Sequence, residues 1–394
     1  MREVYADHAS TTPVAPEVRE AMLPFLAGAF GNASSVHRRG EAAREAVEEA
    51  RGAVARLIGS LPEEIVFTAS ASEANNLALK GVLTALEPAA RRDRRRLVVS
   101  ALEHPSVLET ARHLAARGVP LTVVPPGPDG VVDPELVAHA LGDDVALVSV
   151  MWVNNEVGTI QPIRQIAALA HAAGALVHCD AVQAVGRLPV AVGEAGVDLL
   201  SLAGHKLGGP LGAAALYVRR RLRLVPLVHG GHQERSRRAG TENLAALVGL
   251  GVAARRAAQR LAAGEPARLG ALGERLRAGL LAACPDACRN GDATRRVPTI
   301  VNLGFRGVDG DALLHELDGQ GITISAGSAC SAASPGPSHV LTAMGLSAAD
   351  AHASVRFSLG EGNDEADVNW ILEATPAAIA RLRAMGDPGV RRSA

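Results

Sequence analysis

Between residues 64 and 206 the sequence alternates short apolar runs with longer amphipathic runs, and this alternation constrains the fold more than any other feature. The short runs are rich in Val, Ile and Leu, and the longer runs repeat apolar residues with helical spacing. Strands in strict succession with helices form a mostly parallel sheet that helices cover on both faces, so the sequence predicts an α/β fold. The expected strands are residues 65–68, 97–100, 121–124, 145–153 and 175–180, with a last apolar run ending at Lys206.

The second half of the chain predicts a separate, smaller unit. A long helix is expected over residues 244–262, and a second domain begins near Arg268. The predicted division is a large domain of residues 15–262 and a small domain formed by residues 1–14 and 263–394, with a mobile loop around Cys330. The first residues are polar and turn-prone, so they are expected to form an arm that lies on the body. The expected strands of the small domain are residues 299–304, 322–325 and 355–358, followed by a closing helix.

Composition excludes several classes of function. The chain has 394 residues, a formal net charge of −1 and only 2% aromatic residues, which argues against a nucleic-acid-binding protein. The arginine run of residues 91–96 is therefore expected to be a solvated loop. No apolar stretch is long enough to span a bilayer, and the first residues are not those of a secretion signal, so a cytoplasmic protein is expected.

The cysteines are expected to be free thiols, as is usual in a large cytoplasmic protein. They are Cys179, Cys284, Cys288 and Cys330. Cys284 and Cys288 have a loose metal-like spacing, but no second pair of ligands follows at a suitable distance, so no metal site is expected.

Polar side chains stand where the expected strands end. Because ligands of such sheets bind outside the carboxyl ends of the strands, these residues are expected to lie near one another. They are the residues 70–72, His104, Asn154, Asn155, Asp180 and Lys206.

An acid, an amide and an amine in this arrangement suit a pyridoxal 5′-phosphate site. The Lys206 amine would form a Schiff base with the aldehyde of the cofactor, and Asp180 would keep the pyridine nitrogen protonated. Gln183 follows just beyond Asp180. Taken alone, Lys206 is equally well a surface lysine and Asp180 a helix cap, so the interpretation depends on their combination.

The turn over residues 68–73 is a candidate phosphate site. It lies between an expected strand and an expected helix, where free backbone N–H groups and small side chains let a phosphate approach closely. The alternative is an ordinary helix start, with Ser72 as the cap and Glu73 in the first turn.

Cys330 lies in surroundings that are unusual for a structural cysteine. Gly, Ser and Ala flank it, and residues 334–337 are Ser-Pro-Gly-Pro. This composition favours a mobile loop, whereas a buried cysteine normally has bulky apolar neighbours. Cys330 is therefore a candidate reactive thiol.

Taken together, the motifs resemble the class V aminotransferases and, within them, the cysteine desulfurases of the nitrogen-fixation and iron–sulfur-cluster type. The similarity runs from Asp7 to about Gly360. The motifs that carry it are residues 72–76 (Ser-Glu-Ala-Asn-Asn), 103–104 (Glu-His), 153–158 (Val-Asn-Asn-Glu-Val-Gly), 178–183 (His-Cys-Asp-Ala-Val-Gln), 204–206 (Gly-His-Lys), 238–243 (Arg-Ala-Gly-Thr-Glu-Asn), 326–331 (Ala-Gly-Ser-Ala-Cys-Ser) and 354–358 (Ser-Val-Arg-Phe-Ser).

The resemblance implies a homodimeric enzyme of pyridoxal phosphate fold type I, with a mainly parallel seven-stranded sheet between helices and a smaller α+β domain. It implies conversion of L-cysteine to L-alanine, with the sulfur left as a persulfide on Cys330 for iron–sulfur clusters or other thio-cofactors. A sulfur-acceptor protein is the implied partner, and its identity stays open.

The resemblance also implies a role for each matching residue. Lys206 would hold the cofactor and move the Cα proton, while His104 would stack on the ring and take part in proton transfer. Asp180 would pair with the ring nitrogen and Gln183 with the ring hydroxyl. The phosphate would be bound by Ala71, Ser72 and His205, with Thr241 reaching across from the other subunit, and the substrate carboxylate by Asn155 and Arg356.

The sequence departs from the family pattern at several cofactor positions. Ala203 stands where a serine hydroxyl commonly meets the phosphate, and Ser72 replaces a threonine. Ser70 replaces a glycine, and Leu211 replaces a lysine. The loss of one hydroxyl contact costs about 1 kcal/mol, so a weaker but intact cofactor site is expected.

Alternatives remain at this stage. Another class V enzyme, such as an aminotransferase or a selenocysteine lyase, would share most of these motifs, although an aminotransferase has no use for a thiol at Cys330. A non-catalytic sulfur-carrier scaffold would keep the fold without the cofactor. From position alone, Arg356 is equally an edge-strand arginine in a surface ion pair, and His104 equally a helix cap.

Overall fold

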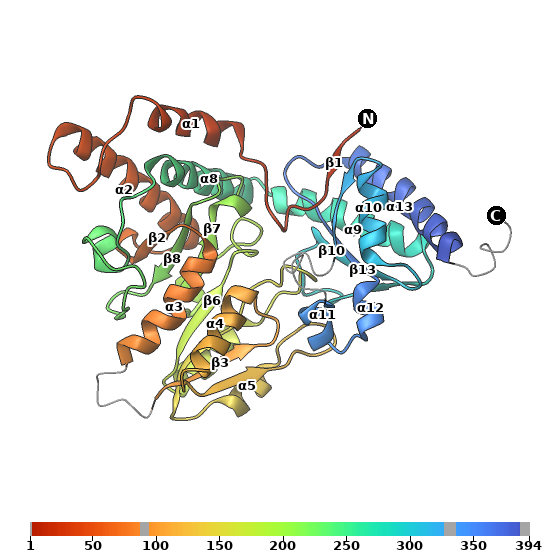
Figure 1. The fold of residues 1–394 in the computed structure, drawn as a ribbon, viewed down its shortest axis with the longest axis horizontal. Helices are drawn as coiled ribbons and strands as arrows, with labels where there is room; N and C mark the ends of the chain where they lie inside the picture. The colour runs from red at the N-terminus through yellow and green to blue at the C-terminus, as the bar shows by residue number, and fades with distance from the viewer. Residues whose placement is uncertain (1, 87–93, 327–335, 387–394) are drawn as a thin grey trace.

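The computed structural model describes residues 2–86, 94–326 and 336–386, and its centre is a seven-stranded sheet (Figure 1). The strand order is β2-β8-β7-β6-β5-β3-β4, and every strand except β8 runs in the same direction. The predicted seven-stranded, mostly parallel sheet is confirmed; the antiparallel β8 was not predicted. The strands are β2 (Ile65–Thr68), β3 (Arg96–Ser100), β4 (Leu121–Val124), β5 (Val145–Ser149), β6 (Leu176–Asp180), β7 (Leu199–Ala203) and β8 (Ala214–Val218).

Helices cover both faces of this sheet because successive strand residues point to opposite sides. Val66 and Leu199 belong to a core with α3 (Ala71–Leu86) and α4 (Pro105–Ala115). Their neighbours Phe67 and Leu200 belong to a larger core on the other face. The helices of that core are α2 (Arg38–Ile58), α5 (Pro134–Ala140), α6 (Ile163–Ala172), α7 (Val192–Ala195) and α8 (Leu244–Ala262), with α1 (Pro16–Leu26) packed on α8.

A smaller α+β part has a core of its own, as predicted. Its antiparallel sheet has the order β12-β13-β10-β9. The first residues of the chain pair with β11 in a separate two-stranded sheet, and Val4 and Ala6 lie in the core of this smaller part. Its elements are β1 (Val4–Tyr5), α9 (Glu265–Ala283), β9 (Ala287–Arg289), β10 (Ile300–Phe305), α10 (Gly310–Asp318), β11 (Ile322–Thr323), β12 (Ser325–Ala326), β13 (Ser354–Ser358) and α13 (Glu365–Gly386).

Some predicted elements differ from the structure. The expected strand over 322–325 is two short strands, because β11 pairs with β1 and β12 pairs with β13. The expected strand over 145–153 ends at Ser149. The short helices α11 (His339–Ala343) and α12 (Ala348–His352) were not predicted, and side chains from both pack against the larger core of the sheet.

The arginine run of residues 91–96 is only partly a loop. Arg96 is the first residue of β3, and its guanidinium holds Asp144 through two hydrogen bonds of 2.8 Å. Arg94 donates to the carbonyl oxygens of Val145 and Ala173. These two arginines therefore tie the amino end of the sheet together, while residues 91–93 lie outside the described part of the chain.

A buried ion pair joins α2 to the loop that precedes α8. The Arg51 guanidinium donates to both carboxylate oxygens of Glu234, at 2.7 and 2.9 Å, and both side chains are at most 4% exposed. Glu234 also accepts from the backbone N–H of Phe67 in β2 at 2.8 Å. Glu234, Arg235 and Ser236 all have positive φ, which is costly for residues with a Cβ. The ion pair therefore holds a strained segment against the strand that leads to residues 69–72.

We predict that Glu234→Leu lowers the free energy of unfolding by about 3 kcal/mol, because the buried Arg51 would lose its buried, doubly bonded counter-charge and keep only the half-exposed Glu48 at 2.9 Å. Urea denaturation measures the change. The matched control is Glu20→Leu, which breaks the exposed Arg19–Glu20 pair and is expected to cost less than about 1 kcal/mol. The double variant Arg51→Met/Glu234→Leu should recover most of the lost free energy of unfolding. If Glu234→Leu and Glu20→Leu lowered the free energy of unfolding equally, the prediction would be contradicted.

Candidate active site

The carboxyl edge of the sheet brings Asp180 and Lys206 onto adjacent parallel strands. Asp180 is the last residue of β6 and pairs in register with Ser201 of β7. Lys206 ends the 3₁₀ helix η2 (Gly204–Lys206), which follows β7 directly. β6 ends at Asp180, and Lys206 lies three residues after the end of β7, so an acid and an amine lie at one edge of the sheet, as expected.

A buried hydrogen-bond network connects Asp180 to His104. One carboxylate oxygen of Asp180 accepts from the Asn75 amide at 2.7 Å, and the other accepts from the Val182 backbone N–H at 3.1 Å. The same Asn75 amide donates to the Ser106 hydroxyl at 2.9 Å, which lies 2.8 Å from Nδ1 of His104. Asp180 is therefore fixed as an acceptor by two N–H donors before any ligand is present.

Neither Asn75 nor Ser106 was singled out from the sequence. Asn75 is fully buried in α3, where Ala74, Leu77 and Ala78 share its core-facing side. A polar residue among apolar residues on the buried face of a helix was the available signal, because such a group needs a partner in the interior.

His104 is both a helix cap and a member of this network. Its Nδ1 accepts from the Ser106 backbone N–H at 3.1 Å at the start of α4. Burial lowers the pKa of His104, and the charge of Lys206 lowers it further against the opposing charge of Asp180. The imidazole is therefore neutral at pH 7, which suits a group that packs against a flat ring.

The N-terminal segment of residues 5–15, the arm, holds Lys206. The Lys206 amine donates to the carbonyl oxygen of Ala9 at 2.6 Å and also to that of Ser10. The Gln183 amide nitrogen donates to the same Ala9 oxygen at 2.7 Å. Thr12 accepts from the Gly208 N–H, which fixes the arm to the segment after Lys206. Backbone carbonyls have no sequence signature, so this contact was not predicted beyond an arm lying on the body.

His205 lies beside Lys206 and is neutral. Its Nδ1 is 3.1 Å from the Thr11 hydroxyl of the arm. Burial lowers the pKa of His205 to about 4, and the neighbouring charge of Lys206 contributes. A neutral imidazole can donate one hydrogen bond to an anion without a full charge of its own.

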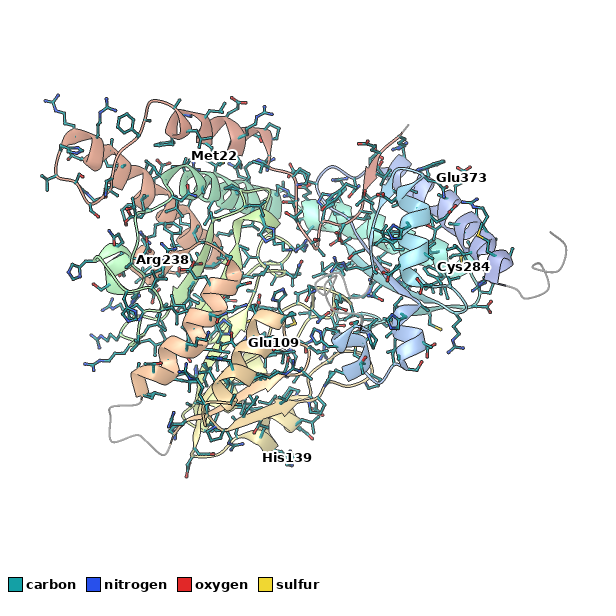
Figure 2. All side chains as sticks on the ribbon, viewed as in Figure 1. Met22, Glu109, His139, Arg238, Cys284 and Glu373 are labelled. Atoms are coloured by element: carbon teal, nitrogen blue, oxygen red, sulfur yellow. The ribbon has the colours of Figure 1, made fainter. Side chains whose placement is uncertain are left out.

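Ser70, rather than Ser72, caps α3. The Ser70 hydroxyl accepts from the Glu73 N–H at 3.1 Å, and Glu73 in return accepts from the Ala69 N–H at 2.9 Å. Arg238, which lies beside the first turn of α3 (Figure 2), donates to Glu73 at 2.9 Å. Ser72 stays exposed next to Ala71, so the alternative in which Ser72 is the helix cap is wrong.

Arg356 lies in the interior and not at a sheet edge. Its strand β13 lies between β10 and β12, and Arg356 is 2% exposed. One η nitrogen donates to Asp7 at 2.7 Å and the other to the Asn155 carbonyl at 2.8 Å. In the described part of the chain, its Nε is buried without a hydrogen-bond partner. The alternative of a surface ion pair on an edge strand is therefore wrong.

The predictions for Thr241, which concerns the partner subunit, and for Cys330 stay predictions. Thr241 is exposed, just before α8, and makes no part of the network around Asp180 in this chain. Cys330 lies in the range 327–335, outside the described residues.

Two buried carboxyl groups flank the site and were not predicted. Glu103 precedes His104, and burial raises its pKa to about 8. It accepts from the Ser100 hydroxyl at 2.6 Å and from the Met151 N–H at 2.7 Å. Glu156 accepts from the Ser338 hydroxyl at 2.5 Å, and burial raises its pKa to about 7. Glu103 is therefore largely protonated at pH 7 and adds little negative charge near Asp180.

Comparisons with known proteins agree with this geometry. The family model for class V aminotransferases matches residues 4–371. The IscS-like cysteine desulfurase of Mycobacterium tuberculosis is 47% identical over 387 residues, which cover 96% of this chain and 97% of that protein. A solved NifS-like protein has a TM-score of 0.90 at 34% identity and covers 97% of this chain and 100% of its own. A structure of SspA in complex with cysteine has a TM-score of 0.78 at 36% identity over 91% of this chain and 99% of its own.

We predict that Glu103→Gln weakens the pH dependence of stability. The folded protein holds the Glu103 proton up to about pH 8, whereas the unfolded chain releases it near pH 4.5, so the free energy of unfolding falls as pH rises between these values. Glutamine stays neutral and keeps the acceptor oxygen, so the fall should shrink, by at most about 4 kcal/mol.

Urea denaturation at pH 5 and pH 8 measures this difference. The control is Glu45→Gln on the exposed side of α2, which should follow the unmodified protein at both pH values. The same pH dependence in Glu103→Gln and in the unmodified protein would show that Glu103 is ionised in the fold.

Proposed function

This chain belongs to the class V aminotransferase family, within which it is a cysteine desulfurase, and on that premise we propose that Lys206 and Cys330 carry the reaction. The substrate would be L-cysteine and the products L-alanine and a persulfide on Cys330. The observation that carries this assignment is the meeting of Asp180, His104 and Lys206 at one sheet edge. The persulfide would supply an acceptor protein that builds iron–sulfur clusters or other thio-cofactors.

The family is generally dependent on pyridoxal 5′-phosphate, and the residues at this edge fit that group. The buried Asp180 carboxylate suits a protonated ring nitrogen, and the neutral His104 suits a ring face. The start of α3, with Ala71 and the exposed Ser72, offers N–H groups and a hydroxyl for a phosphate. The unpartnered Nε of Arg356 suits one oxygen of a carboxylate.

We therefore propose these roles. Lys206 holds the cofactor covalently, Asp180 pairs with its ring nitrogen and Gln183 donates to its ring hydroxyl. Asn155 and Arg356 bind the substrate carboxylate. The phosphate ligands are Ala71, Ser72, His205 and the partner subunit's Thr241.

The departures from the family pattern sit at the phosphate. Ala203 supplies no hydroxyl there, while Ser72 keeps the oxygen of the threonine it replaces. Ser70 is occupied as the cap of α3, so its hydroxyl serves the helix. A cofactor affinity lower by about 1 kcal/mol than with a serine at 203 is the expected consequence.

When bound, pyridoxal phosphate supplies an attachment for the substrate amine and a sink for the electron pair left at Cα. Lys206 takes the Cα proton once its amine is released, and it later returns a proton to the product. The Cys330 thiolate would attack the substrate sulfur, so that the S–S bond forms as the C–S bond breaks, and the electron pair of the C–S bond would stay on Cβ, which gains a proton to become the methyl group of alanine. Because Nδ1 of the neutral His104 accepts from the Ser106 N–H, its ring proton is on Nε2, which would donate that proton and then recover it during turnover.

A homodimer fits the apolar surface near the N-terminus. Leu23, Leu26, Phe30 and Val36 are 48%, 67%, 62% and 99% exposed, on α1 and the residues after it. Large exposed apolar side chains gathered in one segment mark interaction sites in soluble proteins. We propose that a second copy of the chain covers them, and that the same dimer brings the exposed Thr241 to the partner's phosphate site.

The two cores suggest the domain division as well. We propose a large domain of residues 15–262 and a small domain of residues 1–14 and 263–394, with the arm crossing between them. In the described part of the chain no helix is long and apolar enough to cross a membrane.

We predict that Cys330→Ala loses sulfide release from L-cysteine by at least about 100-fold while it keeps the yellow colour of the bound cofactor. Lys206→Ala should lose both. The control is Cys288→Ala, which removes an exposed thiol on β9 and should behave as the unmodified protein. Sulfide assayed with a reductant and the visible spectrum give the readout. Full sulfide release by Cys330→Ala would exclude the proposed role of that thiol.

We also predict that Leu26→Glu/Phe30→Glu converts a dimer into a monomer, because two charges would have to be buried at the interface. Sedimentation velocity measures the mass. The matched control is Met385→Glu, a similarly exposed apolar residue on α13, which should leave the mass unchanged. A dimer that survives the double substitution would place the interface elsewhere.

A further inference from the structure

A cavity of about 660 Å³ lies between the two cores, next to the proposed active site but lined by other residues. Its walls come from the arm, from the turn after Gln183, from the start of α9 and from residues 359–363. His104, Asp180, Asn155 and Ser72 do not line it; Lys206 is shared with the active site. A cavity of this size at a domain junction is a usual place for a small ligand.

The lining is mainly apolar, with a group of charged residues. Apolar side chains include Val14, Leu188, Leu207, Val297 and Leu359. The charged group is His8, Arg187, Arg260 and Glu361, whose members are close enough for the charges of the other three to shift the pKa of His8. An apolar body with one charged end is therefore the shape of ligand that this cavity suits.

The charges in this group do not balance. Arg260 pairs with Glu265 and, at 3.2 Å, with Glu361, and Arg256 also pairs with Glu361 at 2.6 Å. Arg187, in contrast, donates only to neutral oxygens, the amide oxygen of Gln183 at 2.6 Å and the carbonyls of Gln183 and His8. No carboxylate of the described residues forms an ion pair with Arg187.

Other charges around the cavity do not compensate Arg187. Asp367 pairs with Arg2 at 2.7 Å, and Glu3 is exposed to solvent. Burial, together with the charges of Arg356 and Arg260, lowers the pKa of Arg187 to about 10. Burial lowers the pKa of His8 to about 4, with Arg187 and Arg260 contributing. A partly buried cation among other cations lacks an anion.

We propose that the cavity binds a small amphiphilic carboxylate, with the carboxylate on Arg187 and the apolar body against the lining of the arm and α9. A carboxylate would replace neutral acceptors by a charged one and would fill apolar space between the cores. This site adjoins the one proposed for L-cysteine and shares Lys206 with it, but its carboxylate ligand is Arg187 rather than Arg356.

A ligand in the cavity would affect the active site through the hydrogen bonds of the arm. Arg187 bonds to the His8 carbonyl and to the Gln183 amide, and the next residue, Ala9, accepts from both Gln183 and Lys206. A ligand that draws Arg187 away from Gln183 therefore changes what holds Lys206. This effect on turnover rests on the proposed role of Lys206, whereas the binding does not.

Isothermal titration calorimetry of the cofactor-loaded protein with octanoate tests the proposal. Octylammonium has the same chain with the opposite charge, and it should bind at least about tenfold more weakly. Arg187→Gln should weaken octanoate binding by a similar factor, while Arg187→Lys, which keeps the charge, should lose less.

A second pair of variants does not touch Arg187. Ala267→Trp would place a large side chain in the cavity from an exposed position on α9, and it should abolish octanoate binding. Ala271→Trp, also exposed on α9 but outside the cavity, is the matched control and should bind normally.

The binding results show whether the cavity is a carboxylate site. Octanoate binding that depends on Arg187 and on Ala267 supports the proposal, even if the protein releases no sulfide from L-cysteine. No binding at millimolar octanoate, equal binding of octylammonium, or displacement of octanoate by L-cysteine would overturn it.

Discussion

The charge of Asp180, held in the interior at the end of β6, is the feature on which the rest of the site depends. A buried carboxylate is stable only where donors replace the lost water, and Asn75 and the Val182 N–H do so. Burial drives two neighbouring groups toward their neutral forms: it lowers the pKa of His178 to about 4 and raises the pKa of the Cys179 thiol well above its usual value. His178 lies between the hydroxyls of Ser149 and Ser201, so it is satisfied without a charge. The interior thus keeps one anion where a cationic ring nitrogen is proposed to bind.

The arm connects the smaller part of the molecule to the active site. Its first residues belong to the core of the smaller part, yet Ala9 and Ser10 hold Lys206, and Asp7 holds Arg356. The amine and the guanidinium that are proposed to meet the cofactor and the substrate are therefore both positioned by one short segment. A shift of one core against the other would therefore move both Lys206 and Arg356. A ligand in the cavity beside the arm could cause such a shift.

Much of this could be predicted from the sequence, because the strongest signals are local. The alternation of apolar and amphipathic runs predicted the sheet, and the polar residues at the strand ends predicted Asp180 and Lys206 at one edge. The antiparallel direction of β8 was not predicted, because strand direction depends on pairing between distant segments. A short apolar run indicates a strand but not its direction. The roles of Asn75, Glu103 and the Ala9 carbonyl were missed because each depends on what the fold brings near it. Arg356 was left undecided for the same reason: only the pairing of β13 with β10 and β12 shows that it is interior.

The most direct test of the account is to find which amine carries the cofactor. The sequence contains two lysines, Lys80 and Lys206, so the assignment is unambiguous. Protein loaded with pyridoxal 5′-phosphate is reduced with borohydride, which makes the bond permanent, and the labelled peptide is identified by mass spectrometry. The account predicts the label on Lys206. A label on Lys80 or on the terminal amine, or a protein that takes up no cofactor, would contradict it.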